Sequence, residues 1–242
     1  MAEAIAATSG KKDLAVAPGK RRAILELAIP YGLILLVIWT PRPWQKLLWW
    51  VAAAAIVAIF WISFDRMMAL GLRTAGLFRS LWVAVAALLG AAAAILAAHQ
   101  LHTLHLPLGG PMAFIQNYWA YALWACVQQL LLQGFFLPRC LWIARGQVSA
   151  ALLAGILFSL AHLPNPILTP ITLVWGFAAC LLFLRYRNLY PLAMAHAIFG
   201  IAIAITIPGT VDHNMRVGLG YLTYHRHAHL PVPSTQPSSA QP

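Results

Sequence analysis

The sequence predicts an all-α fold, a polytopic bundle of transmembrane helices, and two observations support this expectation. Hydrophobic residues make up 62% of the 242 positions and charged residues only 9%, which is far from the balance of a soluble domain. The apolar residues also fall in long runs, not in alternating or amphipathic patterns. We therefore expect an integral protein of the plasma or inner cell membrane, with the lipid bilayer as its main environment.

Seven apolar segments approach the length of about 20 residues that a helix needs to cross a bilayer. The fifth and sixth are the shortest, and Pro164, Asn165 and Pro166 form a turn between them, so we expect this pair to be bent or partly re-entrant. The expected spans are 23–40, 47–64, 81–98, 113–137, 150–166, 170–184 and 190–207.

The ends of the chain differ in composition from this transmembrane bundle, 23–207. Residues 1–22 form a basic tail, and residues 208–242 form a polar C-terminal segment. From about residue 230 the segment is dominated by Pro, Ser and Gln, a composition that cannot bury a core and predicts disorder.

The basic residues predict the topology of the bundle. The formal net charge is +11, but the sixteen Lys and Arg lie in short clusters between apolar runs and form no basic stripe, so nucleic acid is not an expected partner. With a cytoplasmic N-terminus, most of them fall on the inner side, as the positive-inside rule requires. This inner set is Lys11, Lys12, Lys20, Arg21, Arg22, Arg66, Arg73, Arg79, Arg139, Arg145, Arg185 and Arg187.

Polar side chains inside three of the spans are the candidate functional residues, since such groups are costly in a bilayer. The fourth span carries Gln128, Gln129 and Gln133, and the last two are one helical turn apart. Phe158 and His162 have the same spacing in the fifth span, and His196 and Gly200 have it in the seventh. At a rise of about 1.5 Å per residue, these groups lie at similar depths and can converge.

The order of these elements resembles the CAAX-processing and bacteriocin-processing family of intramembrane metalloproteases. The family signature is Glu-Glu-x-x-x-Arg, then Phe-x-x-x-His, then His-x-x-x-Asn or Asp. This chain has Gln128-Gln129-x-x-x-Gln133, then Phe158-x-x-x-His162, then His196-x-x-x-Gly200, and the resemblance covers residues 118–200. It implies catalytic roles for Gln128, Gln129, His162 and His196, with Gln133, Phe158 and Gly200 in the pocket.

The departures from the signature bear on the activity. Glutamine does not titrate near neutral pH, so neither Gln128 nor Gln129 can serve as the general base. Zinc is the cofactor that the resemblance implies, but His162 and His196 alone fall short of the three protein ligands that a catalytic zinc usually has. Gly200 offers no side chain to an oxyanion, and Asn165 or a backbone group is the alternative donor.

Three functions remain open from the sequence. The first is an endopeptidase that cleaves peptide bonds of membrane-associated substrates with His162 and His196, because an imidazole can act as the base that glutamine cannot. The second is a catalytically inactive relative that binds or stabilises a membrane partner. The third is a transporter whose path is lined by the buried Gln and His. The histidines at 99, 102 and 105 and at 225, 227 and 229 are expected to be solvated loop residues.

Overall fold

The computed structural model describes residues 19–62 and 70–224, which form helices and connecting turns without any strand. Lys11, Lys12, Arg66, the histidines from position 225 and the segment from residue 230 lie outside the described residues. The helices are α2 (Lys20–Trp39), α3 (Trp44–Ile62), α4 (Leu77–Gln100), α5 (Gly110–Leu130), α6 (Leu137–Ile143), α7 (Gln147–Leu160), α8 (Leu168–Tyr186), α9 (Tyr190–Thr206), α10 (Gly209–Asp212) and α11 (Gly218–Leu222). A π-helical segment, η2 (Leu131–Phe136), joins α5 to α6.

Each of the seven apolar segments contains a helix, so the all-α prediction is confirmed. Five stretches are long and apolar enough to cross a bilayer: α2, α3, α4, the combined Gly110–Ile143 and α8. The α7 and α9 helices are shorter. The expected short sixth span is instead a 19-residue helix, and the expected fifth span ends early, at Leu160. The number of crossings and the cytoplasmic N-terminus remain predictions.

Many large apolar side chains point outward in this fold. Trp61, Phe78 and Leu108 are 83%, 85% and 97% exposed, and little of α3 is buried. A water-soluble protein does not expose apolar surface on this scale. These faces therefore lie against lipid, and the protein is an integral membrane protein.

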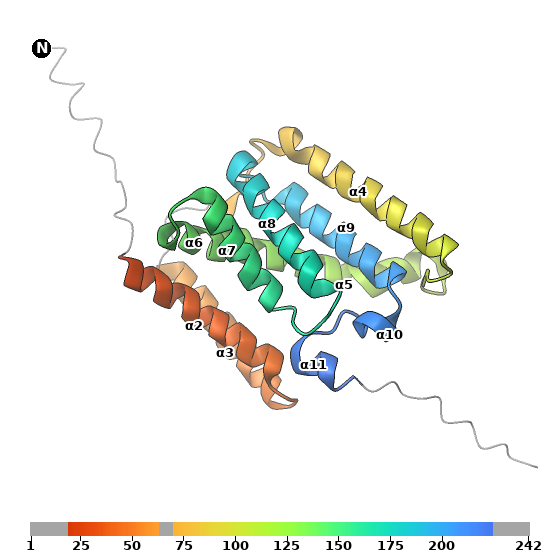
Figure 1. Cartoon of the computed structure of the whole chain (residues 1–242), viewed down its shortest axis with the longest axis horizontal. Helices are drawn as coiled ribbons and strands as arrows, with labels where there is room; N and C mark the ends of the chain where they lie inside the picture. The colour runs from red at the N-terminus through yellow and green to blue at the C-terminus, as the bar shows by residue number, and fades with distance from the viewer. Residues whose placement is uncertain (1–18, 63–69, 225–242) are drawn as a thin grey trace, which may run out of the picture.

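Helices α4, α9, α8 and α7 lie side by side, with α5 running beneath them (Figure 1). The most extensive helix pairs are α7 with α8 and α4 with α9. Helices α7 and α8 cross at two glycines, because a Cβ on Gly155 would lie 2.9 Å from the backbone nitrogen of Phe177 and one on Gly176 would lie 3.2 Å from the Cα of Gly155. Small residues at such a crossing let membrane helices approach closely.

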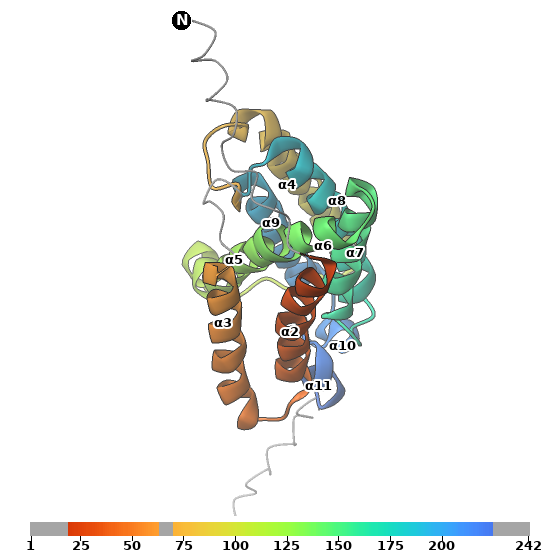
Figure 2. The ribbon, with the colours of Figure 1, turned by 90° about the vertical axis from the view of Figure 1, so that its left-hand side faces the viewer.

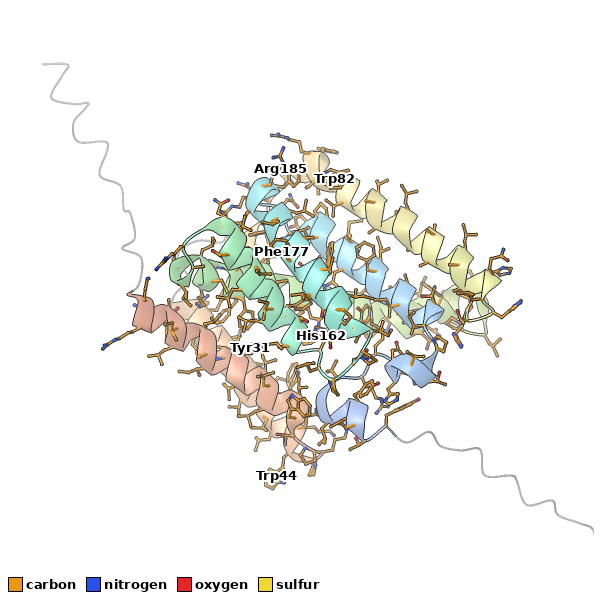
Figure 3. The ribbon with its side chains drawn as sticks, viewed as in Figure 1. Tyr31, Trp44, Trp82, His162, Phe177 and Arg185 are labelled. Atoms are coloured by element: carbon orange, nitrogen blue, oxygen red, sulfur yellow. The ribbon has the colours of Figure 1, made fainter. Side chains whose placement is uncertain are left out.

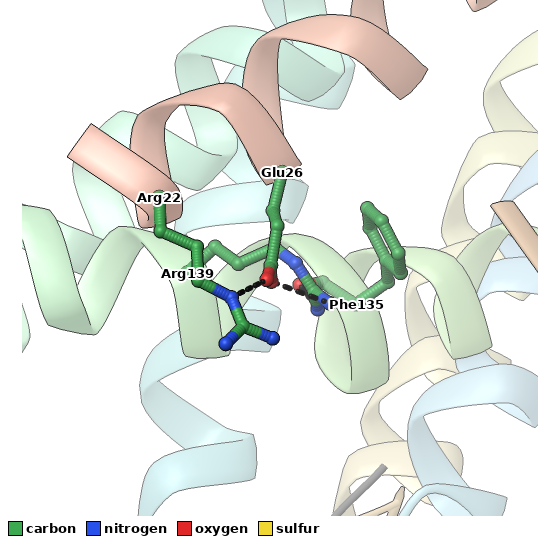
Figure 4. Close-up of polar contacts among 4 residues, drawn as sticks. All are labelled: Arg22, Glu26, Phe135 and Arg139. Carbon is green, nitrogen blue, oxygen red and sulfur yellow. Dashed lines mark hydrogen bonds and ion pairs between the residues drawn. The ribbon is translucent and has the colours of Figure 1, made fainter. Parts of the chain in front are cut away.

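The α2–α3 hairpin stands on one side of this group, as the turned view in Figure 2 shows. Polar contacts attach α2 to α7 and to α6. The Tyr31 hydroxyl donates to the carbonyl of Leu157 on α7 at 2.9 Å. The Glu26 carboxylate lies 2.7 Å from Arg22 on its own helix and 3.2 Å from Arg139 on α6 (Figure 4).

Residues 208–224, the first part of the C-terminal segment, fold back onto the bundle. The buried Asn165 amide fixes them, because its Nδ2 donates to the carbonyls of Asp212 and Arg216 at 2.8 and 3.0 Å. Its Oδ1 accepts from the backbone of Ile167 and Leu168. Burial raises the pKa of the Asp212 carboxyl in this loop. Because both ends of the Asn165 amide are engaged, Asn165 has a structural role here and is not free to stabilise an oxyanion.

The α7–α8 crossing can be tested with Gly155→Ala. The added methyl group meets backbone atoms of Phe177 that cannot easily move, so we expect a loss of about 1–3 kcal/mol, as for other overpacked cores. The matched control is Gly32→Ala on α2, where the added Cβ meets nothing within 4 Å. Thermal unfolding in detergent compares the two variants, and an equal effect of both would contradict the close crossing.

Candidate functional site

The long α5–α6 helix changes its winding just after the glutamine pair. The π-helical segment η2 spans Leu131–Phe136 and includes Gln133. It is followed by Pro138, which lacks the N–H that would continue the α-helical hydrogen bonds. The Arg139 guanidinium donates to the carbonyl of Phe135 at 2.9 Å. The sequence predicts one continuous span at 113–137. In the structure this helix is interrupted at the candidate site, and π-helical segments are frequently found at functional sites.

Gln133, Gln129 and His196 form a buried chain of hydrogen bonds, here called the amide chain. Gln133 Nε2 donates to Gln129 Oε1 at 3.2 Å, and Gln129 Nε2 lies 3.1 Å from His196 Nδ1. An amide nitrogen only donates, so His196 Nδ1 accepts and the ring proton resides on Nε2. The amide chain therefore fixes His196 as a neutral imidazole that presents an N–H from Nε2.

His162 is held in the opposite tautomer. It lies in the turn after α7, and its Nδ1 is 2.7 Å from the carbonyl oxygen of Phe158, one turn earlier. A carbonyl only accepts, so Nδ1 carries the proton and Nε2 keeps its lone pair. His162 is thus prepared to accept a proton at Nε2, whereas His196 is prepared to donate a hydrogen bond.

The Phe158 ring contacts both imidazoles. Its centroid is 4.8 Å from that of His162 and 5.7 Å from that of His196, with both pairs edge to face. The structure therefore brings the Phe158–His162 motif and the His196–Gly200 motif together. The glutamine motif of α5 and η2 joins them through the amide chain. Gln128 is half-buried on the neighbouring face of α5 and takes no part in the amide chain.

Gln128, Phe158 and His162 line an apolar pocket of about 540 Å³. Its walls come from the α2–α3 hairpin on one side and from α5, η2 and α7 on the other. In Figure 3, Tyr31 and His162 mark two of its lining residues. Apart from Tyr31, Gln128 and His162, the lining side chains are apolar or tryptophan. The pocket therefore suits a hydrocarbon or apolar peptide side chain, with a few polar groups at one wall.

Tyr121 occupies the space that a side chain at position 200 would take. A Cβ built on Gly200 would collide with the Tyr121 hydroxyl and ring. The Tyr121 hydroxyl thus lies against α9 one turn from His196. This is the position at which the family signature has Asn or Asp. Sequence reasoning missed this residue, although Tyr121, Ala125 and Gln129 follow one another at i, i+4 spacing on α5.

The donor set does not fit a catalytic zinc ion. His162 and His196 each have Nδ1 engaged, which leaves at most one nitrogen per ring, and the adjacent side chains are neutral amides. Within residues 19–62 and 70–224, no three His, Cys, Asp or Glu side chains gather as ligands. A three-ligand site of the usual kind therefore cannot be built from these groups.

Fold and site together define a polytopic α-helical membrane protein with a buried, neutral His–Gln site beside an apolar pocket. Residues 110–202 match the family model described as type II CAAX prenyl endopeptidase Rce1-like. This match supports the resemblance to the CAAX-processing protease family over the central part of the chain, from the start of α5 into α9, and agrees with the order of its motifs. Comparison with curated proteins and with solved structures gives no significant match.

The amide chain can be tested with Gln129→Leu. This change removes the donor to His196 and the acceptor for Gln133, so we expect a loss of about 2–4 kcal/mol from the buried groups left without partners. Gln128→Leu is the matched control and should cost far less, because Gln128 faces the pocket. Unfolding midpoints in detergent distinguish the two, and equal losses would argue against the amide chain.

The packing of Tyr121 against Gly200 predicts a rescue. Gly200→Ala alone should lower stability by about 1–3 kcal/mol, because the methyl group collides with the phenol. Combining it with Tyr121→Val removes the phenol and should restore part of that loss, giving a coupling energy of at least about 0.5 kcal/mol between the positions. Additive effects of the two changes in a double-mutant cycle would show that they do not touch.

Proposed function

We propose that this protein is an intramembrane endopeptidase in which His162 is the general base and His196 stabilises the oxyanion. The observation that carries the proposal is the opposite tautomers of the two imidazoles around one Phe158 ring. The similarity of residues 110–202 to the CAAX-type family supports peptide-bond cleavage as the reaction class. An uncharged imidazole can take the role that glutamate cannot fill in this chain.

In the proposed reaction, the substrate peptide lies in the apolar pocket with its scissile carbonyl at the wall formed by Phe158 and His162, next to which His196 lies. A water molecule, oriented by the Gln128 amide, attacks the carbonyl carbon and transfers its proton to His162 Nε2. The negative charge that forms on the carbonyl oxygen accepts a hydrogen bond from His196 Nε2–H. The C–N bond then breaks, and His162 returns its proton to the leaving amine.

The amide chain and Tyr121 support the site in this scheme. Gln129 holds His196 in the donor tautomer, and Gln133 orients Gln129 in turn. The Tyr121 hydroxyl, next to Gly200, supplies a polar group near the turn of α9 that carries His196. The substrate class that fits the pocket is a membrane-anchored peptide with an apolar residue or chain near the cleavage site.

A binding function without catalysis is the second candidate, and the neutral amide chain favours it. Glutamine stands at every position where the family signature has a charged residue in this helix. The three replacements remove opposite charges together, which leaves a pocket able to hold a membrane partner without activating water. Both candidates use the same pocket, so the experiment must separate chemistry from binding.

The proposed roles predict different responses to glutamine substitution. His162→Gln removes the base and should lower cleavage by about 10²-fold or more. His196→Gln keeps a side-chain donor and should retain more activity than His196→Ala, which loses the oxyanion hydrogen bond, worth about 10²–10³ in rate. His99→Ala, an exposed histidine at the end of α4, is the control and should not change cleavage.

The measurement is mass spectrometry of new peptide termini in membranes that contain wild-type protein or each variant at equal folded amounts. Termini that persist unchanged in the His162 and His196 variants would rule out the proposed peptidase. The companion variant Gln128→Glu with Gln129→Glu then tests the binding candidate. New cleavage by that variant, absent from the wild type, would identify the natural chain as a non-catalytic binder.

A further inference from the structure

A second pocket, here called the arginine pocket, lies at the end of the bundle where α4 begins and α8 ends. It has a volume of about 400 Å³ and is lined by Arg73, Gly76, Arg79, Arg185 and Tyr186. None of these residues belongs to the His–Gln site. Three of the five lining residues carry guanidinium groups, and they come from segments more than 100 residues apart in the sequence.

The loop that carries Arg73 is held in place by hydrogen bonds to the α8–α9 turn. Arg73 Nε donates to the carbonyl of Arg187 at 2.9 Å. The buried Asn188 amide donates to the carbonyls of Arg73 and Ala75 at 2.6 and 3.2 Å. Gly76 has a φ of +78°, and a Cβ there would lie 2.7 Å from the carbonyl oxygen of Tyr186. The backbone that carries Arg73 is therefore held against the α8–α9 turn, while Arg79 and Arg185 are exposed residues at the edge of the pocket.

Among the residues that the structure describes, no acidic side chain lines this pocket. Within the described residues, the carboxylates are those of Glu26 and Asp212. Glu26 pairs with Arg22 and Arg139, and Asp212 is the last residue of α10. Three arginines lining one pocket give it a positive charge, which attracts an anion. Guanidinium groups match the geometry of phosphate oxygens through paired N–H donors.

The arginine pocket is level with an aromatic pair typical of a membrane interface. Trp82 Nε1 donates to the Tyr186 hydroxyl at 3.2 Å, and Figure 3 shows Trp82 and Arg185 close together at this edge of the bundle. Tryptophan and tyrosine concentrate at the depth of lipid headgroups. Basic pockets between helices at this depth suit the phosphates of acidic lipids.

We propose that the arginine pocket binds a phosphate group, with the headgroup of an acidic phospholipid as the source that its depth favours. Arg79 and Arg185 hold the phosphate oxygens, and Arg73 adds charge from the loop. The pocket thereby fixes the bundle at the membrane interface, independently of any chemistry at the His–Gln site.

The test is a titration of the purified full-length protein in neutral detergent with three probes: phosphatidylglycerol, phosphatidylcholine and inorganic phosphate. Phosphatidylglycerol should raise the thermal unfolding midpoint in a saturable way, because a ligand that binds the folded state stabilises it. Phosphatidylcholine, whose headgroup has no net charge, should not. Arg79→Gln and Arg185→Gln should each weaken the apparent affinity for phosphatidylglycerol by about fivefold.

Two further variants separate this site from general surface charge. Arg145→Gln changes an exposed arginine in the α6–α7 connection and should leave the affinity unchanged. Arg185→Lys keeps the charge and should retain more affinity than Arg185→Gln. Equal affinities in wild type, Arg79→Gln and Arg185→Gln, or equal stabilisation by phosphatidylcholine, would overturn the proposal. Saturable stabilisation by inorganic phosphate that the same two variants weaken would support the phosphate site and assign it a soluble ligand.

Discussion

The buried contact between Glu26 and Arg139 is the constraint on which the rest of the site depends. Arg139 is 3% exposed and Glu26 9% exposed, and the guanidinium also lies 3.8 Å above the Phe135 ring. A charge in an apolar bundle is costly unless it is paired, so neither residue can leave the other without a large penalty. The pair therefore fixes α2 against the end of the π-helical segment and, through α2, holds the hairpin that walls the apolar pocket.

Much of the fold could be predicted from the sequence, because bilayer crossing imposes a length and composition that single sequences display. The apolar runs locate the helices, and the i, i+4 spacing of Gln129 and Gln133 anticipates their hydrogen bond. The early end of α7 could not be predicted, since the apolar run continues to Leu163, next to the proline turn, whereas the helix ends at Leu160. The π-helical segment was also missed, because Pro138 indicates a break without saying which winding results.

The candidate site is less predictable, because its decisive features are contacts between distant segments. The two histidines and three glutamines stand out as polar groups in apolar spans, but nothing in the order of residues indicates their tautomers. Those depend on partners: the carbonyl of Phe158 for His162 and the amide of Gln129 for His196. Tyr121 could not be recognised, since its importance comes from the missing side chain of Gly200 on another helix.

The amide chain has a direction, and only in the observed direction does His196 carry its proton on Nε2. A glutamine amide carries a donor at one end and an acceptor at the other, so a half-turn of both Gln129 and Gln133 exchanges the two ends without moving any helix. Gln129 would then present its oxygen to His196, whose proton would move to Nδ1, and His196 Nε2 would become an acceptor. In a glutamate-based site a fixed negative charge forbids such a reversal. The orientation of two neutral amides thus decides whether His196 Nε2 donates or accepts a hydrogen bond.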